Sequence, residues 1–324
     1  MKIREKSDGY VIEYPQAIVF EDLQQDVGWT AKEIDVQSDI NDLLVHTSEA
    51  QSHGILSTLK LFTEYELQAG SEYWGGRFKR LYPRVEFQRL GAEFARTELC
   101  VHAPFYNTIN EVLHLNTPEF YNSWKIDPVL TERMQYIEDS IKSEEFDGLL
   151  SLAVFSMIEG AVLYSSFAYL KSYKKQGLNL IPNIVSGVNF SVRDENLHSE
   201  AGAWVFNETL KESEYTLEDI KPRILKAAQD LYEHESLIVD KTFEKGEPPG
   251  QSATDLKLFV KHRIDVCLSQ LNIEPMFKAE KSDIESWFYD DINGARATDH
   301  FATLSSNYSR NWKEQGFKWK PKSQ

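Results

Sequence analysis

The chain has 324 residues, with 35 lysines and arginines against 51 aspartates and glutamates, so its formal net charge is −16 at pH 7. That acidity argues against nucleic-acid binding, which needs a basic surface, and it is compatible with binding of metal cations. The length suffices for one large helical domain or two ordinary ones.

The N-terminus gives no sign of export or membrane insertion. Met1–Lys6 lacks the apolar core of a signal peptide. No run reaches the roughly 18 apolar residues that are needed to cross a bilayer. The two cysteines, Cys100 and Cys267, each lie within a helical pattern and cannot provide a disulfide framework. We therefore expect a cytoplasmic protein without a membrane segment.

Helical periodicity begins after an N-terminal arm. Residues 1–28 show no long periodic pattern, and Tyr10–Pro15 is typical of a short extended stretch. Hydrophobic spacing predicts helices over residues 38–49, 52–73 and 85–115. Pro104 should kink the last of these, because proline removes a backbone donor and crowds the preceding turn.

The second half of the chain is also helical in pattern. Asp127-Pro128 starts a helix that reaches Lys142, with the acid at the cap and proline in the first turn. Residues 147–173 are apolar nearly all round, which is typical of a helix at the centre of a bundle. Further helices are expected over residues 183–210, 216–244 and 252–271. Strand signals are nearly absent, so we predict an all-α fold in one domain.

One motif has the spacing of a metal ligand pair. Glu195 and His198 lie three residues apart and would share one face of a helix. They could hold one metal ion, with Asp194 beside them as a partner for a ligand imidazole. Surface helices also produce this pair by chance. A di-metal carboxylate bundle would need a glutamate from each of two helices and a Glu/His pair from each of the other two.

Two further helices carry matching residues. Glu159 lies within the most apolar helix, where it needs a proton, a cation or a metal; a protonated or salt-bridged glutamate would also satisfy it. Glu98 and His102 are four residues apart, which is also the spacing of an ordinary helical pair. A π-bulge, frequent at functional sites, would absorb the extra residue and keep both groups facing inward.

The fourth helix offers several carboxylates. Glu64, Glu66 and Glu72 all lie within residues 52–73. Glu66 is in phase with the apolar Leu59 and Phe62, so it is the inward candidate. The other two are expected to be solvated. The chain therefore contains, in order, Glu, Glu/His, Glu and Glu/His, which is the complete ligand set of a di-metal carboxylate site.

With this ligand set, the chain resembles the small, radical-generating subunit of class I ribonucleotide reductase over about residues 20–310. The resemblance rests on Ser191–His198, on the apolar helix around Glu159, and on Trp29-x-x-x-Glu33-Ile34-Asp35. It implies a ferritin-like helical bundle over residues 29–292. An N-terminal arm (1–28) and a flexible tail (293–324) that contacts the large subunit would flank it.

The resemblance also implies roles for individual residues. The two metals would be held by Glu66, Glu98, His102, Glu159, Glu195 and His198. Tyr106, four residues after His102, would form the tyrosyl radical, with Leu163 and Phe167 in its apolar pocket; without the metal site, a buried packing tyrosine would be the simpler interpretation. Trp29, Asp194 and His102 would relay the radical, and Tyr308 would pass it to the large subunit.

The implied function is that of a ribonucleoside-diphosphate reductase subunit in deoxyribonucleotide biosynthesis. Two iron ions in a di-iron-oxo centre would activate dioxygen, with manganese or a mixed pair as the alternative metals, and the protein would be a homodimer. The tail departs from the family pattern, since it is basic and aromatic where family tails are commonly acidic. Two other hypotheses stay open: another ferritin-like di-metal oxidase, ligand-binding or desaturase-like, and a non-enzymatic helical scaffold.

Overall fold

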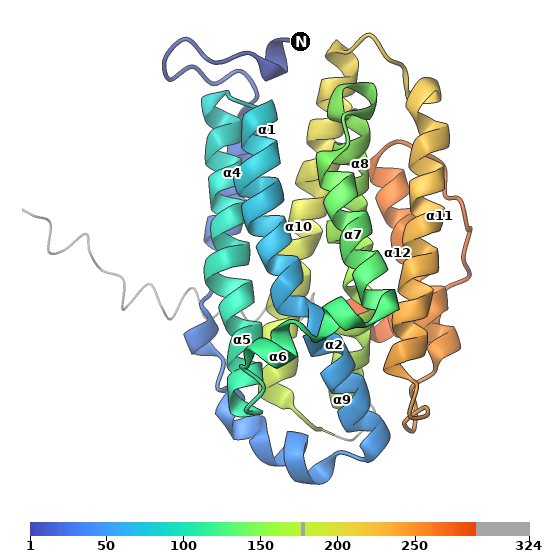
Figure 1. The fold of residues 1–324 in the computed structure, drawn as a ribbon. Coiled ribbons are helices and arrows are strands. Elements are labelled where there is room, and N and C mark those ends of the chain that lie inside the picture. Colours follow the sequence, from blue (N-terminus) through green and yellow to red (C-terminus); the bar gives the residue numbers. More distant parts are fainter. Residues whose placement is uncertain (176–178, 290–324) are drawn as a thin grey trace, which may run out of the picture.

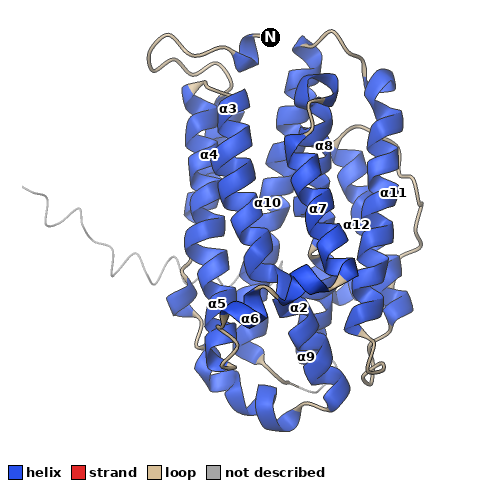
Figure 2. Cartoon of the chain, in the orientation of Figure 1, coloured by secondary structure: helices blue, strands red, loops and turns tan. Residues whose placement is uncertain are grey.

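The computed structural model describes residues 1–175 and 179–289. Every regular element within these ranges is a helix, and loops make up the rest (Figure 2). The long helices run roughly along one common axis (Figure 1). The predicted all-α fold is therefore confirmed for the described part of the chain.

The N-terminal segment differs from the predicted arm, because it contains the helix α1 (Pro15–Asp26), which packs against α4 (Val85–Thr97). Its buried face carries Glu21 and Gln24 besides apolar residues. Glu21 is satisfied by Arg89, whose Nη2 donates to Oε1 at 2.9 Å. Polar residues on the buried face obscure the apolar periodicity, which explains why the sequence pattern did not reveal this helix.

The next helix begins at a reciprocal cap. The Ser48 hydroxyl accepts from the Gln51 amide, and the Gln51 side chain accepts from the Ser48 amide, at the start of α2 (Glu49–Leu67). The chain continues through a π-helical stretch, η5 (Gln68–Phe78), into the short α3 (Lys79–Leu81). The helix predicted over 38–49 is confirmed in part: residues 36–46 are helical, as η3 (Val36–Asp39), two α-helical residues and the π-helical η4 (Asp42–His46), and the predicted end at 49 is too late.

The helix predicted over 85–115 is made of three contiguous pieces: α4, the π-turn η6 (Glu98–His102) and α5 (Ala103–Val112). The π geometry predicted from the Glu98–His102 spacing is confirmed. Pro104 follows directly on η6 within this continuous helix, so its missing N–H falls where the α-helical pattern is already interrupted. Next come α6 (Pro118–Tyr121) and α7 (Pro128–Lys142), and Asp127 caps α7 as predicted, accepting from two backbone amides.

The most apolar segment forms the centre of the bundle as α8 (Leu149–Met157), the π-turn η9 (Ile158–Val162) and α9 (Tyr164–Lys175). Contrary to the sequence expectation, Glu145–Lys174 is long and apolar enough to cross a membrane, with a window of mean hydropathy 1.7. However, 89% of that window is buried inside the bundle. Its apolar surface is therefore used for packing between helices, as in the core helix of a soluble protein.

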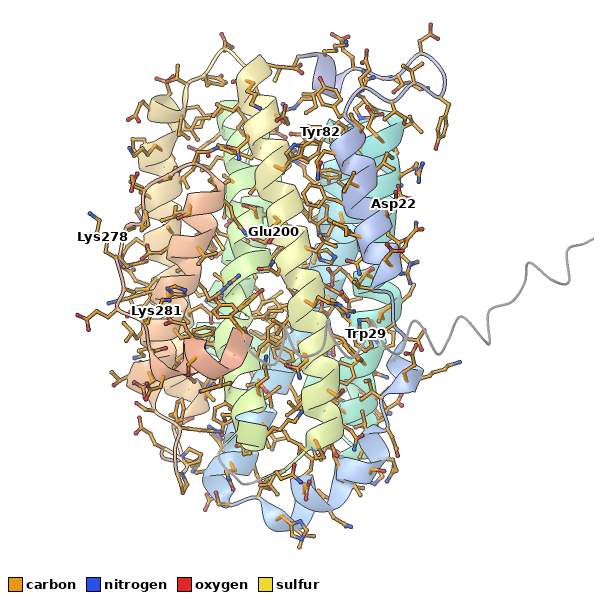
Figure 3. The ribbon with its side chains drawn as sticks, turned by 180° about the vertical axis from the view of Figure 1, so that it is seen from behind. Asp22, Trp29, Tyr82, Glu200, Lys278 and Lys281 are labelled. Atoms are coloured by element: carbon orange, nitrogen blue, oxygen red, sulfur yellow. The ribbon has the colours of Figure 1, made fainter. Side chains whose placement is uncertain are left out.

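Three long helices complete the bundle: α10 (Pro182–Glu212), α11 (Leu217–Thr242) and α12 (Ala253–Gln270). The start of α10 is held by Asp39, which accepts from the Ile184 amide and the Asn183 side chain, both at 2.7 Å. Seen from behind, α10 crosses the middle of the molecule with α1 on one side and α12 on the other (Figure 3). Residues 283–289 are again helical. The predicted tail and Tyr308 lie outside the described residues.

Candidate metal centre

The six predicted ligands meet in the middle of the bundle. Glu66 comes from the last turn of α2, Glu98 and His102 from η6, Glu159 from η9, and Glu195 and His198 from α10. Each of these side chains is buried, and none exposes more than 6% of its surface. Residues up to 132 positions apart in sequence are thus brought together as the spacing argument predicted.

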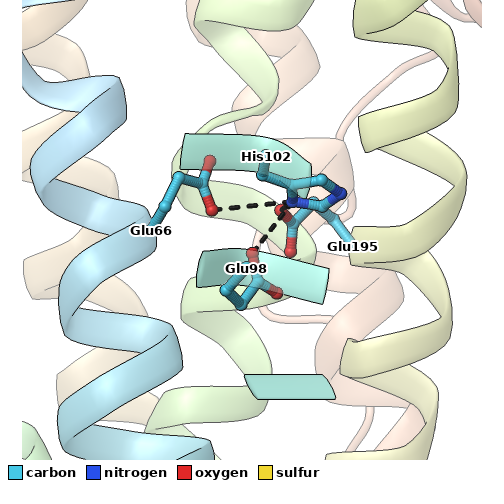
Figure 4. Close-up of side chains that lie close together, drawn as sticks. All are labelled: Glu66, Glu98, His102 and Glu195. Carbon is cyan, nitrogen blue, oxygen red and sulfur yellow. Dashed lines mark ion pairs between the residues drawn. The ribbon is translucent and has the colours of Figure 1, made fainter. Parts of the chain in front are cut away.

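The ligand atoms form two groups. In the first, atoms of Glu66, Glu98, His102 and Glu195 lie within 4.8 Å of one another. The Nδ1 atom of His102 is 2.9 Å from Glu98 Oε2, 3.2 Å from Glu195 Oε1 and 3.6 Å from Glu66 Oε2 (Figure 4). This arrangement offers three oxygens and one nitrogen to a single cation.

The second group consists of Glu98, Glu159, Glu195 and His198, again within 4.8 Å. The Nδ1 atom of His198 is 2.6 Å from Glu98 Oε1, 3.5 Å from Glu195 Oε2 and 4.0 Å from Glu159 Oε2. Glu98 and Glu195 belong to both groups and use a different oxygen in each. Both carboxylates are therefore placed to bridge two cations.

Helix geometry around the ligands is unusual. Glu98 and Glu159 lie within the π-turns η6 and η9, and the π-helical η5 begins two residues after Glu66. A π-turn widens the helix and changes which residues share a face. In η6, Glu98 and His102 both face the centre. The helix α10 needs no such turn, because Glu195 and His198 are three apart.

The site concentrates negative charge. Burial raises the pKa of Glu66 well above its usual range, and the nearby Glu98 adds to the effect. Burial and then Glu195 do the same to Glu159. Burial also opposes ionisation of Glu98, but the two imidazoles outweigh it and hold the pKa of Glu98 well below its usual range. Burial would lower the pKa of His198, yet Glu98 and Glu195 raise it to about 9.

Four buried carboxylates share only two imidazoles. Nδ1 of His102 and Nδ1 of His198 each lie against oxygens of Glu98 and Glu195, whereas Glu66 Oε1 has no hydrogen-bond partner among the described residues. Buried carboxylates crowded in this way need protons or cations to offset their charge. The residues present therefore fit a pair of metal cations, whose binding displaces protons from such ligands.

The outer nitrogen of each imidazole is also held. Asp194 Oδ2 accepts from Trp29 Nε1 at 2.8 Å and lies 3.1 Å from His102 Nε2. With Nε2 turned to Asp194, Nδ1 of His102 faces the carboxylates. The predicted group of Trp29, Asp194 and His102 is therefore continuous, and it starts just after α1, where Figure 3 labels Trp29.

Two neighbours of the ligands were missed by the sequence argument. Gln24 of α1 places Oε1 3.2 Å from His198 Nε2. Trp74 of η5 donates its indole N–H to Glu159 Oε1 at 2.7 Å. Gln24 lies in the segment interpreted as an arm, and nothing in the sequence distinguishes Trp74 from a packing residue. Both hold ligands in place, as outer partners commonly do.

Tyr106 lies one turn after His102 in α5 and is fully buried. Its ring packs against Phe62, with centroids 4.6 Å apart, and Phe62 in turn packs against Phe167 at 5.6 Å. Burial, followed by the charge of Glu66, raises the pKa of the phenol well above its usual range. The phenol is thus kept protonated in an apolar pocket.

A small cavity adjoins the centre. It is lined by Glu66, Glu159 and Glu195 on the ligand side and by apolar residues such as Leu163 on the other. Its volume of about 20 Å³ is the space of about one water molecule.

Comparisons with known proteins agree on one family. The model of the family "Ribonucleotide reductase, small chain" matches residues 8–284. A probable ribonucleoside-diphosphate reductase small subunit of Invertebrate iridescent virus 3 is 22% identical over 92% of this chain and 83% of its own length. The ribonucleoside-diphosphate reductase subunit beta of Halalkalibacterium halodurans is 24% identical over 89% and 84%.

Solved structures show the same fold. The dimanganese(II)-NrdF of Streptococcus sanguinis superposes with a TM-score of 0.73 at 18% identity, covering 85% of this chain and 94% of that one. A putative class I ribonucleotide reductase from Bacillus halodurans gives 0.70 at 20% identity, covering 86% and 99%. The ferritin-like fold implied by the sequence resemblance is thereby confirmed.

Proposed function

Since the chain belongs to the family of ribonucleotide reductase small chains, we propose that it generates the radical that a large subunit uses to reduce ribonucleotides. The observation that carries this proposal is the pair of four-ligand groups sharing Glu98 and Glu195. A di-metal carboxylate centre needs two metals close together, and the shared carboxylates would place them so. Membership of this family identifies the protein as a subunit of an oxidoreductase. The radical mechanism is our proposal.

The proposed cofactor is a pair of iron ions, with manganese or a mixed pair as alternatives. Four carboxylates and two imidazoles are the oxygen and nitrogen ligands that suit these metals, and they discriminate weakly among them. When bound in its reduced form, the metal pair supplies the electrons that activate dioxygen. The protein's contribution is to fix the ligands with Asp194, Gln24 and Trp74 and to keep bulk water out of the centre.

Tyr106 is the proposed radical residue. Formation of a neutral phenoxyl radical removes one electron and one proton from its hydroxyl. The raised phenol pKa keeps the hydroxyl protonated, so oxidation to the neutral radical would have to release a proton as well as an electron. Phe62 and Phe105 pack against its ring, at 4.6 and 5.0 Å between centroids. This apolar surrounding would protect the radical from reductants.

The proposed route to the large subunit begins at His102 and passes through Asp194 to Trp29. Its support is the unbroken pair of contacts from His102 Nε2 to Asp194 Oδ2 and from there to Trp29 Nε1. Tyr308, outside the described residues, is the proposed last carrier within this chain. The large subunit as partner, the homodimer and the cytoplasmic location all stay predictions.

The cavity beside the metals weighs against the second hypothesis, a desaturase-like oxidase. An enzyme that oxidises an apolar substrate needs a pocket for it next to the metals, and such pockets usually reach about 300 Å³ or more. The cavity lined by Glu66, Glu159 and Leu163 measures about 20 Å³. It has room for dioxygen or water, but not for such a substrate.

Electron paramagnetic resonance would test the proposal directly. Metal-free protein would receive ferrous iron and oxygen, in parallel with Tyr106→Phe and Tyr173→Phe. Tyr173 is a suitable control because it is equally buried but lies in α9, bonded to Tyr169. We expect a tyrosyl signal in the parent and in Tyr173→Phe, and none in Tyr106→Phe, which should still bind two metals. A protein that takes up neither iron nor manganese would overturn the proposal.

A further inference from the structure

A buried arginine lies next to the metal centre without taking part in it. Arg263 of α12 is 2% exposed. Its Nε donates to the carbonyl oxygen of Gly160 at 2.9 Å, and its Nη1 donates to the hydroxyl of Tyr289 at 2.9 Å. Its guanidinium carbon lies 4.0 Å from the ring centroid of Tyr164. One side chain therefore joins the residue after Glu159 to the helical stretch 283–289.

The contact with Gly160 depends on the missing side chain there. A Cβ atom at this position would lie 2.4 Å from Cys267 Sγ and 2.4 Å from Ser199 Oγ. Ser199 itself donates to the carbonyl oxygen of Ser156 at 2.8 Å. The backbone on both sides of Glu159 is therefore held by side chains of other helices, Ser199 from α10 and Arg263 from α12.

This outside support matters because Glu159 lies in the π-turn η9. Such turns are rare, since the α-helix is the more favourable geometry, and they occur mostly as single turns at functional sites. A hydrogen bond from a charged donor is about twice as strong as a neutral one. Arg263 is thus placed to stabilise the wide turn and, through it, the direction in which Glu159 points.

The other end of the contact leads toward the C-terminal part of the chain. Within 283–289, Phe288 packs against Phe259 of α12 at 4.8 Å and Tyr164 of α9 at 5.7 Å between centroids. Lys171 donates to the carbonyl oxygen of Phe288 at 2.9 Å. Residues 283–289 are therefore fixed to α9 and α12. Arg263 lies on α12 and contacts Tyr164 of α9.

We propose that Arg263 is a positioning residue that holds Glu159 toward His198 and Glu195 and couples this ligand to the stretch 283–289 through Tyr289. The inference rests on the proposed metal function. It predicts that the two metal sites respond differently when Arg263 is changed, because Glu159 belongs only to the group that contains His198. The group of Glu66 and His102 should be unaffected.

Manganese(II) binding to the metal-free full-length chain would test this. We would titrate Mn²⁺ into the parent, Arg263→Lys and Tyr289→Phe, following free and bound ion by electron paramagnetic resonance. Lysine keeps the charge but lacks the planar fork that reaches two acceptors. We expect Arg263→Lys to weaken one of two bound ions about tenfold, the lower limit for losing an outer partner of a ligand. Tyr289→Phe should weaken the same ion by a smaller factor.

Arg84→Gln provides a matched control. Arg84 is also a buried arginine, paired with Glu86, but it lies about 20 Å along α4 from Glu98. Its loss should lower the melting temperature without changing either Mn²⁺ affinity. Equal weakening of both ions in Arg263→Lys, or no weakening of either, would overturn the inference. Tyr289→Phe carries the same test if Arg263→Lys fails to fold, and a parent that binds no Mn²⁺ would instead contradict the proposed function.

Discussion

Trp29 donates its indole N–H to Asp194 across 165 positions of sequence, at 2.8 Å in the buried interior. This hydrogen bond fixes the loop after α1 to the helix that carries two of the proposed metal ligands. A hydrogen bond to a charged group contributes about 1.5–3 kcal/mol. The same carboxylate oxygen lies 3.1 Å from His102 Nε2, so one acceptor contacts both Trp29 and a proposed ligand.

Trp29→Phe should separate relay from radical formation. Phenylalanine keeps an aromatic ring but has no N–H, so Asp194 loses a donor while the six ligands stay in place. We expect metal binding and the Tyr106 radical to persist, with ribonucleotide reduction by the mixture with the large subunit falling to background. The radical signal and the turnover would be measured on the same samples. Trp204→Phe, also on the α1 side of the bundle, serves as the control; full turnover in Trp29→Phe would contradict the proposed route.

Asp194→Asn should weaken metal binding. An amide is a poorer acceptor for His102 Nε2–H than a carboxylate, and loss of such an outer partner typically costs 10–100-fold in metal affinity. We expect about that loss in an Fe²⁺ or Mn²⁺ titration, mainly at the group containing His102. Asp265→Asn is the matched control, because Asp265 is a buried acid that accepts from the amides of Phe277 and Ala279. Unchanged affinity in Asp194→Asn would show that the contact does not orient the imidazole.

Gln24→Met tests whether α1 belongs functionally to the centre. Methionine has similar volume but cannot pair with His198 Nε2, so the ring loses its outer partner. We expect the ion at the group containing His198 to bind about tenfold more weakly, as measured by titration with Mn²⁺. Gln25→Met, on the exposed side of the same helix, should bind both ions like the parent. If both variants behave alike, α1 has no role in holding the ligand.

Glu86 should contribute to acid sensitivity. Burial opposes its ionisation, but backbone amides and Arg84 outweigh burial and lower its pKa. Its folded-state pKa therefore lies below the unfolded value of about 4.3. The stabilisation is complete above that value and is lost as the pH falls through the folded-state pKa. Thermal unfolding between pH 6 and 3 should show a smaller loss of stability for Glu86→Gln than for the parent.

A suitable control for this pH effect is Glu138→Gln, which removes an exposed carboxylate paired with Lys142 on α7. Exposed pairs contribute little to stability, so this variant should follow the pH dependence of the parent. The backbone amides of Glu13 and Tyr14 donate to Glu86. An identical pH dependence for Glu86→Gln and the parent would contradict the prediction, because it would mean that these contacts hold the N-terminal segment without the negative charge of Glu86.

The clustering of the six proposed ligands could be predicted from sequence because several constraints were local. Glu195 and His198 share a helix face by spacing, and the four-residue separation of Glu98 and His102 allowed a wide turn, which the structure contains as η6. The π-turn η9 could not be predicted in this way, because Glu159 is the only ligand on its helix and gives no spacing to measure. Gln24 and Trp74 were missed because their contacts depend on how distant helices pack.

The N-terminal segment shows a different limit. A helix is recognised in sequence by an uninterrupted apolar face, whereas α1 buries Glu21 and Gln24 among its apolar residues. Glu21 pairs with Arg89 besides its neighbour Gln25, and Gln24 contacts His198. Arg89 and His198 lie far along the chain. The information that makes α1 a buried helix is therefore tertiary, and local periodicity does not contain it.

The small cavity beside Glu66 and Glu159 has a consequence for how the protein acquires its metals. A hydrated divalent ion carries several waters, and the cavity admits about one. An ion that reaches the centre by this cavity would therefore have to exchange most of its waters for protein oxygens on the way. Glu66, Glu159 and Glu195 line the cavity on the ligand side, so the first oxygens that the ion would meet are those proposed to hold it.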